Sequence, residues 1–423
     1  MRHIFAKSTL TVKRILFVIT FIIGTLHIAC AATEPDLMLL DNTEKIVQYG
    51  LDSTGSWWAI TQPYEQFVHV YINGKRYGPY SSSTLPRFSN DGSTWAFAFV
   101  RDLQAYVRTP EDEKRIAAER INGVVFGSQS PIPWVEFSVS DIRTITDGST
   151  TYSTTGAIGL AKLDPSGTVV WHVARRGSQM ALVRNGVDKY VYDDIELAGV
   201  WSDARPVFSA RIGALWTVFL GEQELVGNMQ RVLNLTVNAF GTVVAFNASS
   251  PSSFINSYMY TDDYRNCWVG PNLDEARDLV LSPCCDLIAV PGKAQGGSRV
   301  VLFNSAAYPA GTATSRPAFS FDGAHMAFTG NDGESFISMD GLRHAVRGGV
   351  ALSAQCALSP SGSTVAWTSS TTLVVYDLDR EKMTLNKMCD TMSLDVIYNR
   401  RTSEYQALGL YGARLFLLSS PAR

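Results

Sequence analysis

The sequence of 423 residues predicts an all-β fold, a β-propeller of seven or eight blades, with eight slightly preferred. The first observation is a phrase of strand, tight turn and strand that recurs along the chain, most clearly at residues 316–332. There Asp322-Gly323 separates two apolar runs, which is a hairpin signal because glycine tolerates the positive φ of such turns. The second observation is the spacing of the copies, about 40 residues or twice that.

The copies align on the turn residue. The gaps after Gly92 and Gly167 are about twice the others, so each is expected to hide a degenerate copy, within residues 124–139 and around Gly213. Residues 396–417 are a last, weak copy. Six copies carry glycine in the turn and a seventh has cysteine there: Gly55, Gly92, Gly167, Gly241, Gly323, Gly362 and Cys285.

A fixed period of short strands is typical of a propeller, because one small sheet cannot bury both of its faces alone. Packing sheets around an axis buries those faces, and closing the ring protects the strand edges. One blade is expected to take strands from both chain ends. The alternative, a chance recurrence of turns in a β-sandwich, is disfavoured by seven aligned copies over about 310 residues.

The repeated phrase resembles the WD-like repeats of TolB-type envelope proteins and of the propellers in prolyl-oligopeptidase-type peptidases. Residues 71–80, YINGKRYGPY, and residues 183–195, VRNGVDKYVYDDI, are similar to a second phrase found in bacterial members. The resemblance covers most of residues 51–377 and implies a propeller. It implies no single function, because enzymes, scaffolds and receptors share this fold.

The N-terminus predicts export. Residues 1–14 carry four basic and no acidic side chains, and residues 15–29 are apolar. About 15 apolar residues are too few for a comfortable membrane span and suit a signal peptide, placed at residues 1–30. Residues 31–44 are expected to be a tether and residues 45–420 a single propeller domain.

The end of the signal allows two interpretations. Residues 26–30 resemble a lipobox, in which Cys30 would be acylated after cleavage, although His27 stands where leucine is usual. The alternative is cleavage after Ala31, which would give a protein without a lipid. The expected location is therefore the periplasm or the membrane surface through a lipid anchor.

Removing the signal removes four of 36 basic residues and none of 39 acidic ones, so the mature chain is acidic. This balance argues against nucleic acid and against electrostatic binding to anionic lipid. Two segments interrupt the β pattern. Residues 101–120 are expected to end a strand and form a short helix or excursion, either a solvated loop or a functional lid, and residues 141–155 a mobile loop.

No catalytic, metal-binding or cofactor-binding residues are assigned. None of His69, His172, His325 and His344 stands in a metal-ligand spacing, and no G-x-S-x-G motif is present. Residues 89–95 resemble a sialidase Asp-box but are one residue short. Six tryptophans that follow repeat turns are expected to fill the core between blades, rather than to stack on sugars: Trp57, Trp58, Trp95, Trp171, Trp216 and Trp367.

Six cysteines are present, in a compartment that permits disulfides. We expect a bond between Cys356 and Cys389, which flank one repeat. Cys267 is expected to pair with Cys284 or Cys285, which leaves one free thiol if Cys30 is acylated or removed.

The sequence favours a non-catalytic binding scaffold of the cell envelope with a protein partner. The first alternative is an enzyme, a hydrolase or lyase with its site in the channel, which would need carboxylates converging from several blades. The second is a sensor of a small ligand or sugar. Residues 101–120 and 141–155 could border one sector of the ring and are the first candidates for partner contact, because loops carry recognition.

Overall fold

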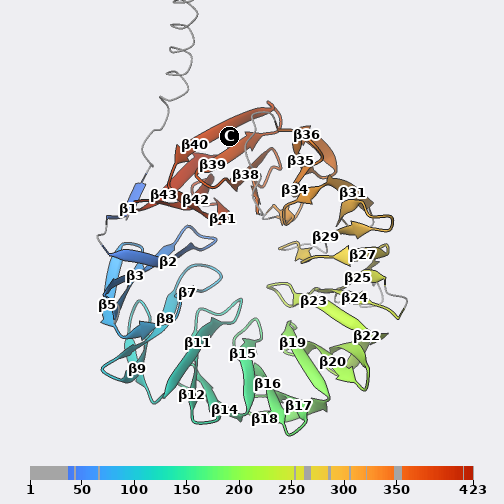
Figure 1. Cartoon of the computed structure of the whole chain (residues 1–423). Coiled ribbons are helices and arrows are strands. Elements are labelled where there is room, and N and C mark those ends of the chain that lie inside the picture. The colour runs from blue at the N-terminus through green and yellow to red at the C-terminus, as the bar shows by residue number, and fades with distance from the viewer. Residues whose placement is uncertain are drawn as a thin grey trace, which may run out of the picture.

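The computed structural model describes residues 37–41, 44–64, 67–251, 254–261, 268–283, 287–303, 306–320, 322–346, 355–412 and 414–422. Within these residues the chain forms strands and turns, arranged as small antiparallel sheets around an axis (Figure 1). In most of these sheets the chain runs up and down, with its first strand toward the axis and its last strand toward the rim, whereas β1 lies at the outer edge of its sheet (Figure 1). The predicted all-β propeller is therefore confirmed.

Each group of about four successive strands is called a unit here, and the units are numbered along the chain. Unit 1 is β2 (Lys45–Leu51), β3 (Trp57–Tyr64), β4 (Phe67–Ile72) and β5 (Lys75–Tyr80). Unit 2 is β6 (Ser82–Ser83), β7 (Arg87–Phe88), β8 (Trp95–Arg101), β9 (Gln104–Arg108) and β10 (Glu113–Ile116). Unit 3 is β11 (Arg120–Phe126), β12 (Pro133–Val139), β13 (Ile142–Thr146) and β14 (Thr151–Thr155).

The next two units are regular four-stranded sheets. Unit 4 is β15 (Ala157–Leu163), β16 (Val170–Arg176), β17 (Gln179–Arg184) and β18 (Val187–Tyr192). Unit 5 is β19 (Asp194–Val200), β20 (Pro206–Ile212), β21 (Leu215–Leu220) and β22 (Gln223–Met229).

Units 6, 7 and 8 are joined into one sheet of 14 strands. Unit 6 is β23 (Arg231–Val237), β24 (Val244–Ser249), β25 (Ile255–Tyr260) and β26 (Trp268–Val269). Unit 7 is β27 (Leu273–Ala276), β28 (Val280–Leu281), β29 (Ile288–Ala294), β30 (Arg299–Phe303) and β31 (Ala306–Gly311). Unit 8 is β32 (Ala313–Thr314), β33 (Ala318–Phe319), β34 (Met326–Asn331), β35 (Ser335–Met339) and β36 (Leu342–Ala345).

The last two units complete the ring. Unit 9 is β37 (Ala357–Leu358), β38 (Thr364–Thr368), β39 (Thr372–Asp377) and β40 (Lys382–Met388). Unit 10 is β41 (Thr391–Asn399), β42 (Glu404–Tyr411), β43 (Arg414–Pro421) and β1 (Leu37–Asp41). Its strands come from both chain ends, as expected, because β1 pairs with β43. The boundary at residue 45 was wrong, since residues 37–41 of the expected tether belong to this sheet.

The strand pairing of the described residues gives eight sheets, one of which spans units 6, 7 and 8, so the ten units follow the order along the chain rather than separate sheets. The number of blades therefore stays a prediction. Turn glycines undercount the repeats because other residues occupy that place. In unit 5 the turn residue is Ala204, with φ of 68°, and its N–H donates to the carbonyl of Trp201 at 2.9 Å. Gly213, around which this copy is predicted, lies instead in the β20–β21 hairpin.

The turn glycines adopt the expected conformation. Gly92, Gly323 and Gly362 have φ of 66°, 69° and 68°, which confirms the tight turns. A second reason for glycine is contact between the turns of successive units. A Cβ on Gly362 of unit 9 would lie 2.7 Å from Cγ of His325 in unit 8, closer than such atoms approach.

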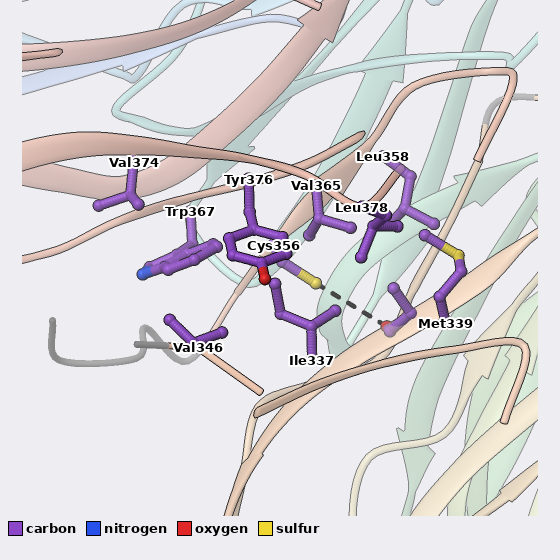
Figure 2. Packing of buried hydrophobic residues seen from close by; sticks show 11 residues of the cluster. Ile337, Met339, Val346, Cys356, Leu358, Val365, Trp367, Val374, Tyr376 and Leu378 are labelled. Atoms are coloured by element: carbon purple, nitrogen blue, oxygen red, sulfur yellow. Dashed lines mark hydrogen bonds between the residues drawn. The ribbon is translucent and has the colours of Figure 1, made fainter. Parts of the chain in front are cut away.

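The core lies between units. Figure 2 shows one cluster, in which Trp367 and Tyr376 of unit 9 pack with Ile337 and Met339 of unit 8. The tryptophan prediction is confirmed for Trp57, Trp171 and Trp367, which are buried. Trp58, Trp95 and Trp216 are partly buried against other core clusters.

Two expectations about the interruptions are wrong. Residues 101–120 contain strands β9 and β10 and no helix, and residues 141–155 are the hairpin of β13 and β14. Both segments are polar because they form outer strands of their sheets, and outer strands of a blade face water. Among the described residues there is no helix long and apolar enough to cross a membrane.

The expected disulfide is also wrong, since Cys356 and Cys389 are buried free thiols. Cys356 packs between units 8 and 9, and its Sγ donates to the carbonyl of Ala327 at 3.8 Å (Figure 2). Cys389 packs between units 9 and 10 with Ala366, whose neighbour Trp367 faces the cluster of Cys356. Successive strand residues face opposite ways, so the sheet of unit 9 separates the two thiols.

The remaining predictions about the N-terminus and cysteines fall on residues outside those described. They concern the signal peptide at residues 1–30, the tether up to residue 36, and Cys30, Cys267, Cys284 and Cys285.

Candidate functional site: an arginine-lined cleft between units 3 and 4

A cleft of about 1040 Å³ opens between units 3 and 4 and is called the arginine cleft here. Its walls come from the start of β11, the β12–β13 turn, the β14–β15 connection and the β16–β17 turn. Because the strands run alternately up and down, these segments lie on the face opposite the glycine turns. The cleft is lined by Glu119, Arg120, Ser138, Ser140, Asp141, Arg143, Thr155, Gly156, Ala157, Ile158, Arg175, Arg176 and Gly177.

A buried carboxylate supports the cleft. Glu136 on β12 has no exposed surface, and its Oε2 accepts the N–H of Ala161 in unit 4 at 2.9 Å. Its Oε1 accepts a hydrogen bond from Nη1 of Arg143 at 3.0 Å. Arg143 also donates to the carbonyl of Gly159. Both backbone groups belong to a bulge in β15, where the pairing with β16 shifts between Ile158 and Lys162. These bonds connect the two units beneath the cleft.

His172 of unit 4 lies beside this carboxylate. Its Nε2 is 3.7 Å from Oε1 of Glu136, has no hydrogen-bond partner among the described residues, and belongs to a side chain that is 1% exposed. The imidazole of His172 therefore lies beside the Glu136–Arg143 pair but does not take part in its hydrogen bonds.

A sequence signal for Glu136 was present but was not used. Glu136 stands six residues after the turn position Ser130, between apolar Val135 and Phe137 in β12. Asn247, also six residues after its turn position, donates to the carbonyl of Arg277 in the next unit at 3.1 Å. The same position is polar and buried in three further units, at Thr61, Thr329 and Thr368. From this position Glu136 and Asn247 contact the backbone of the next unit, whereas Thr61 donates to Glu44 of its own unit. The hydroxyls of Thr329 and Thr368 have no hydrogen-bond partner among the described residues.

The four guanidinium groups of the cleft differ in their partners. Arg176 pairs with both carboxylate oxygens of Asp188, at 2.8 Å each, and Arg143 is held as above. Arg120 and Arg175 are exposed and have no side-chain hydrogen bond or ion pair within the described part of the chain. The acidic side chains of the lining are Glu119 and Asp141, so the cleft carries an excess of positive charge.

Exposed apolar side chains accompany these cations. Ile158 in the lining is 43% exposed, and Val139 and Ile142 of the bordering β12–β13 turn are 38% and 46% exposed. Arginine beside apolar surface is the composition found at the energetic centres of protein interfaces.

The two segments singled out in the sequence do border one sector. A concavity of about 400 Å³ between units 2 and 3 is lined by Thr109, Asp112 and Lys114 from residues 101–120, and by Asp147 and Gly148 from residues 141–155. The arginine cleft is lined by the ends of the same segments, at Arg120 and Asp141.

The four histidines named in the sequence analysis do not form a common site. His69 Nδ1 lies 3.0 Å from Oε2 of Glu44 in unit 1, and His325 Nδ1 lies 2.7 Å from Oδ2 of Asp340 in unit 8. His344 is partly exposed on β36. A search of the described residues for three or more grouped His, Cys, Asp or Glu side chains finds no such group.

The inner wall of the ring has a concavity of about 480 Å³ along β7, β11, β15, β19 and β23. Among the described residues, its charged lining groups are Arg87 and Lys162, and Asn90 and Asn238 add amides. This part of the wall is basic and apolar rather than a funnel of carboxylates.

Comparison with known proteins finds no matching family model and no matching curated protein. Among solved structures, the chain is similar to a eukaryotic initiation factor, at 11% identity over 73% of this chain and 87% of that one, with a TM-score of 0.49. An oligogalacturonate lyase in complex with manganese matches at 11% identity over 89% and 97%, with a TM-score of 0.40. An oligogalacturonate lyase from Vibrio parahaemolyticus matches at 10% identity over 71% and 97%, with a TM-score of 0.33. At these values the likenesses decide neither function nor the number of blades.

Proposed function

We propose that this protein is a non-catalytic binding scaffold of the cell envelope, and that a partner protein docks on the face that holds the arginine cleft. The observation that carries the proposal is the combination of Arg120 and Arg175, which have no side-chain partner among the described residues, with exposed Ile158 in the same cleft and exposed Ile142 on its border. Such sites gain affinity from burying apolar surface and gain specificity from their charges.

The rigid ring supports this role. The cleft is built on strand ends and short turns, and the Glu136 bonds connect its two walls, so the binding groups are held in place before a partner arrives. Preorganisation of this kind lowers the entropy cost of binding. Export through the N-terminal signal, with or without acylation of Cys30, and the resemblance to TolB-type repeats favour an envelope partner.

The test is photo-crosslinking in living cells of the source organism. A photoreactive amino acid replaces Ile142 or Ile158 in the full chain, and Leu342 of unit 8, which is 70% exposed, serves as the control position. We expect one defined protein adduct from positions 142 and 158 and none from position 342. Adducts from position 342 alone would refute the docking face. Turnover of a glycan or other small substrate by the purified protein would refute the non-catalytic role.

A further inference from the structure

Two guanidinium groups of the arginine cleft already have partners. Arg143 is bound to Glu136 and to the carbonyl of Gly159, and Arg176 is bound to Asp188 and donates to the carbonyl of Thr155 at 2.7 Å. These contacts connect neighbouring strands and do not require a ligand.

Arg120 and Arg175 are different. They lie at the same cleft but on separate units, on β11 and β16, and both are exposed without a side-chain partner in the described ranges. A guanidinium presents several N–H donors in one plane, a geometry that matches the two oxygens of a carboxylate. Of the acidic groups nearby, Glu119 already accepts the N–H of Ser140 at 2.8 Å.

The apolar rim decides which anion fits best. An inorganic anion or an acidic saccharide would use the guanidinium groups but would leave Ile142 and Ile158 in water. A peptide can present carboxylates and apolar side chains on one short segment, so it matches both features of the cleft.

We infer that the arginine cleft binds an acidic segment of a partner polypeptide, in which two carboxylates pair with Arg120 and Arg175 and an apolar side chain covers Ile142 and Ile158. This inference deepens the proposed function and rests on it. Because the mature chain is acidic overall, the attraction is local to the cleft, where the guanidinium groups outnumber the carboxylates.

The experiment uses a phage-displayed library of short random peptides, panned against the purified full chain. Enriched sequences are expected to combine Asp or Glu with Leu, Ile or Val. Enrichment is expected to disappear for the double variant Arg120→Gln/Arg175→Gln. The variant Arg401→Gln changes an exposed arginine in the β41–β42 turn and is expected to retain the same peptides.

An enriched peptide is then measured by titration calorimetry. Replacing its Asp and Glu by Asn and Gln is expected to weaken binding about tenfold or more, and so is the double variant. The two changes together are expected to cost little more than either alone, because both remove the same ion pairs. Inorganic phosphate and vesicles containing phosphatidylglycerol are tested as separate ligands.

The inference is overturned if no peptide is enriched, if the enriched peptides lack acidic residues, or if they bind the double variant equally well. It is also overturned if phosphate or the vesicles bind through Arg120 and Arg175 while the peptides do not. If any of these results is found but crosslinks still form at positions 142 and 158, only the acidic-peptide inference fails and the proposed docking of a partner protein is retained. Acidic peptides that bind the cleft without any cellular crosslink would refute the docking proposal instead.

Discussion

The carboxylate of Glu136 in unit 3 accepts the backbone N–H of Ala161 in unit 4 at 2.9 Å, and both residues are almost fully removed from water. The same carboxylate holds Arg143. The buried carboxylate of Glu136 therefore links two units and holds one arginine of the cleft in place. Replacing Glu136 should lower the free energy of unfolding and should release the side chain of Arg143 from this carboxylate.

Glu136→Ala is expected to lower the free energy of unfolding by about 3 kcal/mol, because it leaves the Ala161 N–H and one guanidinium without their buried acceptor. Glu136→Gln keeps an oxygen acceptor and is expected to cost less. Urea denaturation followed by tryptophan fluorescence measures both. Glu222→Gln, at an exposed site, is the control and should change little. Equal stability of Glu136→Ala and the control would contradict the structural role.

Gly362→Ala is expected to destabilise the protein by about 2–3 kcal/mol, through its positive φ and through contact with the His325 ring. The ring cannot move freely because its Nδ1 is bonded to Asp340. Gly213→Ala is the matched control, since Gly213 has φ of 65° but open space around a Cβ. It is expected to cost only about 1 kcal/mol. Equal losses in thermal or urea unfolding would mean that the contact between turns contributes nothing.

Cys356 and Cys389 are expected to resist alkylation in the native protein. Burial raises the pKa of Cys356 to about 12 and that of Cys389 to about 11, so the reactive thiolate is scarce at pH 8. Peptide mapping after iodoacetamide treatment should find both unmodified in buffer and both modified in guanidinium chloride without a reductant. A peptide that contains the two cysteines linked would restore the disulfide.

The Asp91 turn is expected to contribute to stability in a pH-dependent way. The Ser89 hydroxyl, 2.6 Å away, and the N–H and hydroxyl of Ser93 lower the pKa of Asp91 to about 2. With an ordinary pKa of 3.8 in the unfolded chain, the contribution is complete above about pH 4 and is lost as the pH falls through about 2.

Ser89→Ala should therefore raise the pKa of Asp91, which NMR titration measures. Its destabilisation relative to the natural protein should shrink between pH 6 and pH 2. It will not vanish, because Ser89 also bonds the backbone of Thr94. Asp91→Asn lacks the titrating group, so in that background the effect of Ser89→Ala should stay constant over this range. An unchanged pKa of Asp91 in Ser89→Ala would exclude the proposed cause.

Cys30 is expected to carry lipid. Labelling of cells with palmitate should mark the protein, and Cys30→Ala should abolish the label. An unlabelled mature protein that begins after Ala31 would instead establish cleavage without acylation.

The propeller and its turn glycines could be predicted because both depend on local rules. An Asp-Gly turn between apolar runs needs only its neighbours, and Gly323 behaves as expected. The turn of unit 5 was placed at the wrong residue because Ala204 adopts the conformation that glycine usually takes in this turn. The disulfide was wrong because the face of a sheet that a cysteine takes depends on register, which spacing does not reveal.

The arginine cleft was beyond the sequence for a different reason. Glu136 and Arg143 lie on paired strands of unit 3, and both reach backbone groups of unit 4 at the bulge of β15. Gly159, with φ of 69°, is a signal for such a bulge, because glycine inside a strand often marks one. The contacts that the bulge makes with the next unit depend on packing, which the glycine does not reveal. The adjacency of the two polar segments was correctly expected, although their structure was not.

The pairing of β1 with β43 has a consequence for how the molecule assembles. Arg414 donates to Asp41 at 2.9 Å, across 373 positions of the chain. Because the chain is synthesised from its N-terminus, β1 is made first and its edge stays unpaired until β43 has been made. The entropy cost of so large a loop grows only logarithmically, but finding the partner takes time. We therefore expect the pairing of β1 with β43 to form last on folding and to break first on unfolding. The ring would then open into a spiral with an unpaired strand edge at each end, and such edges can pair with other chains.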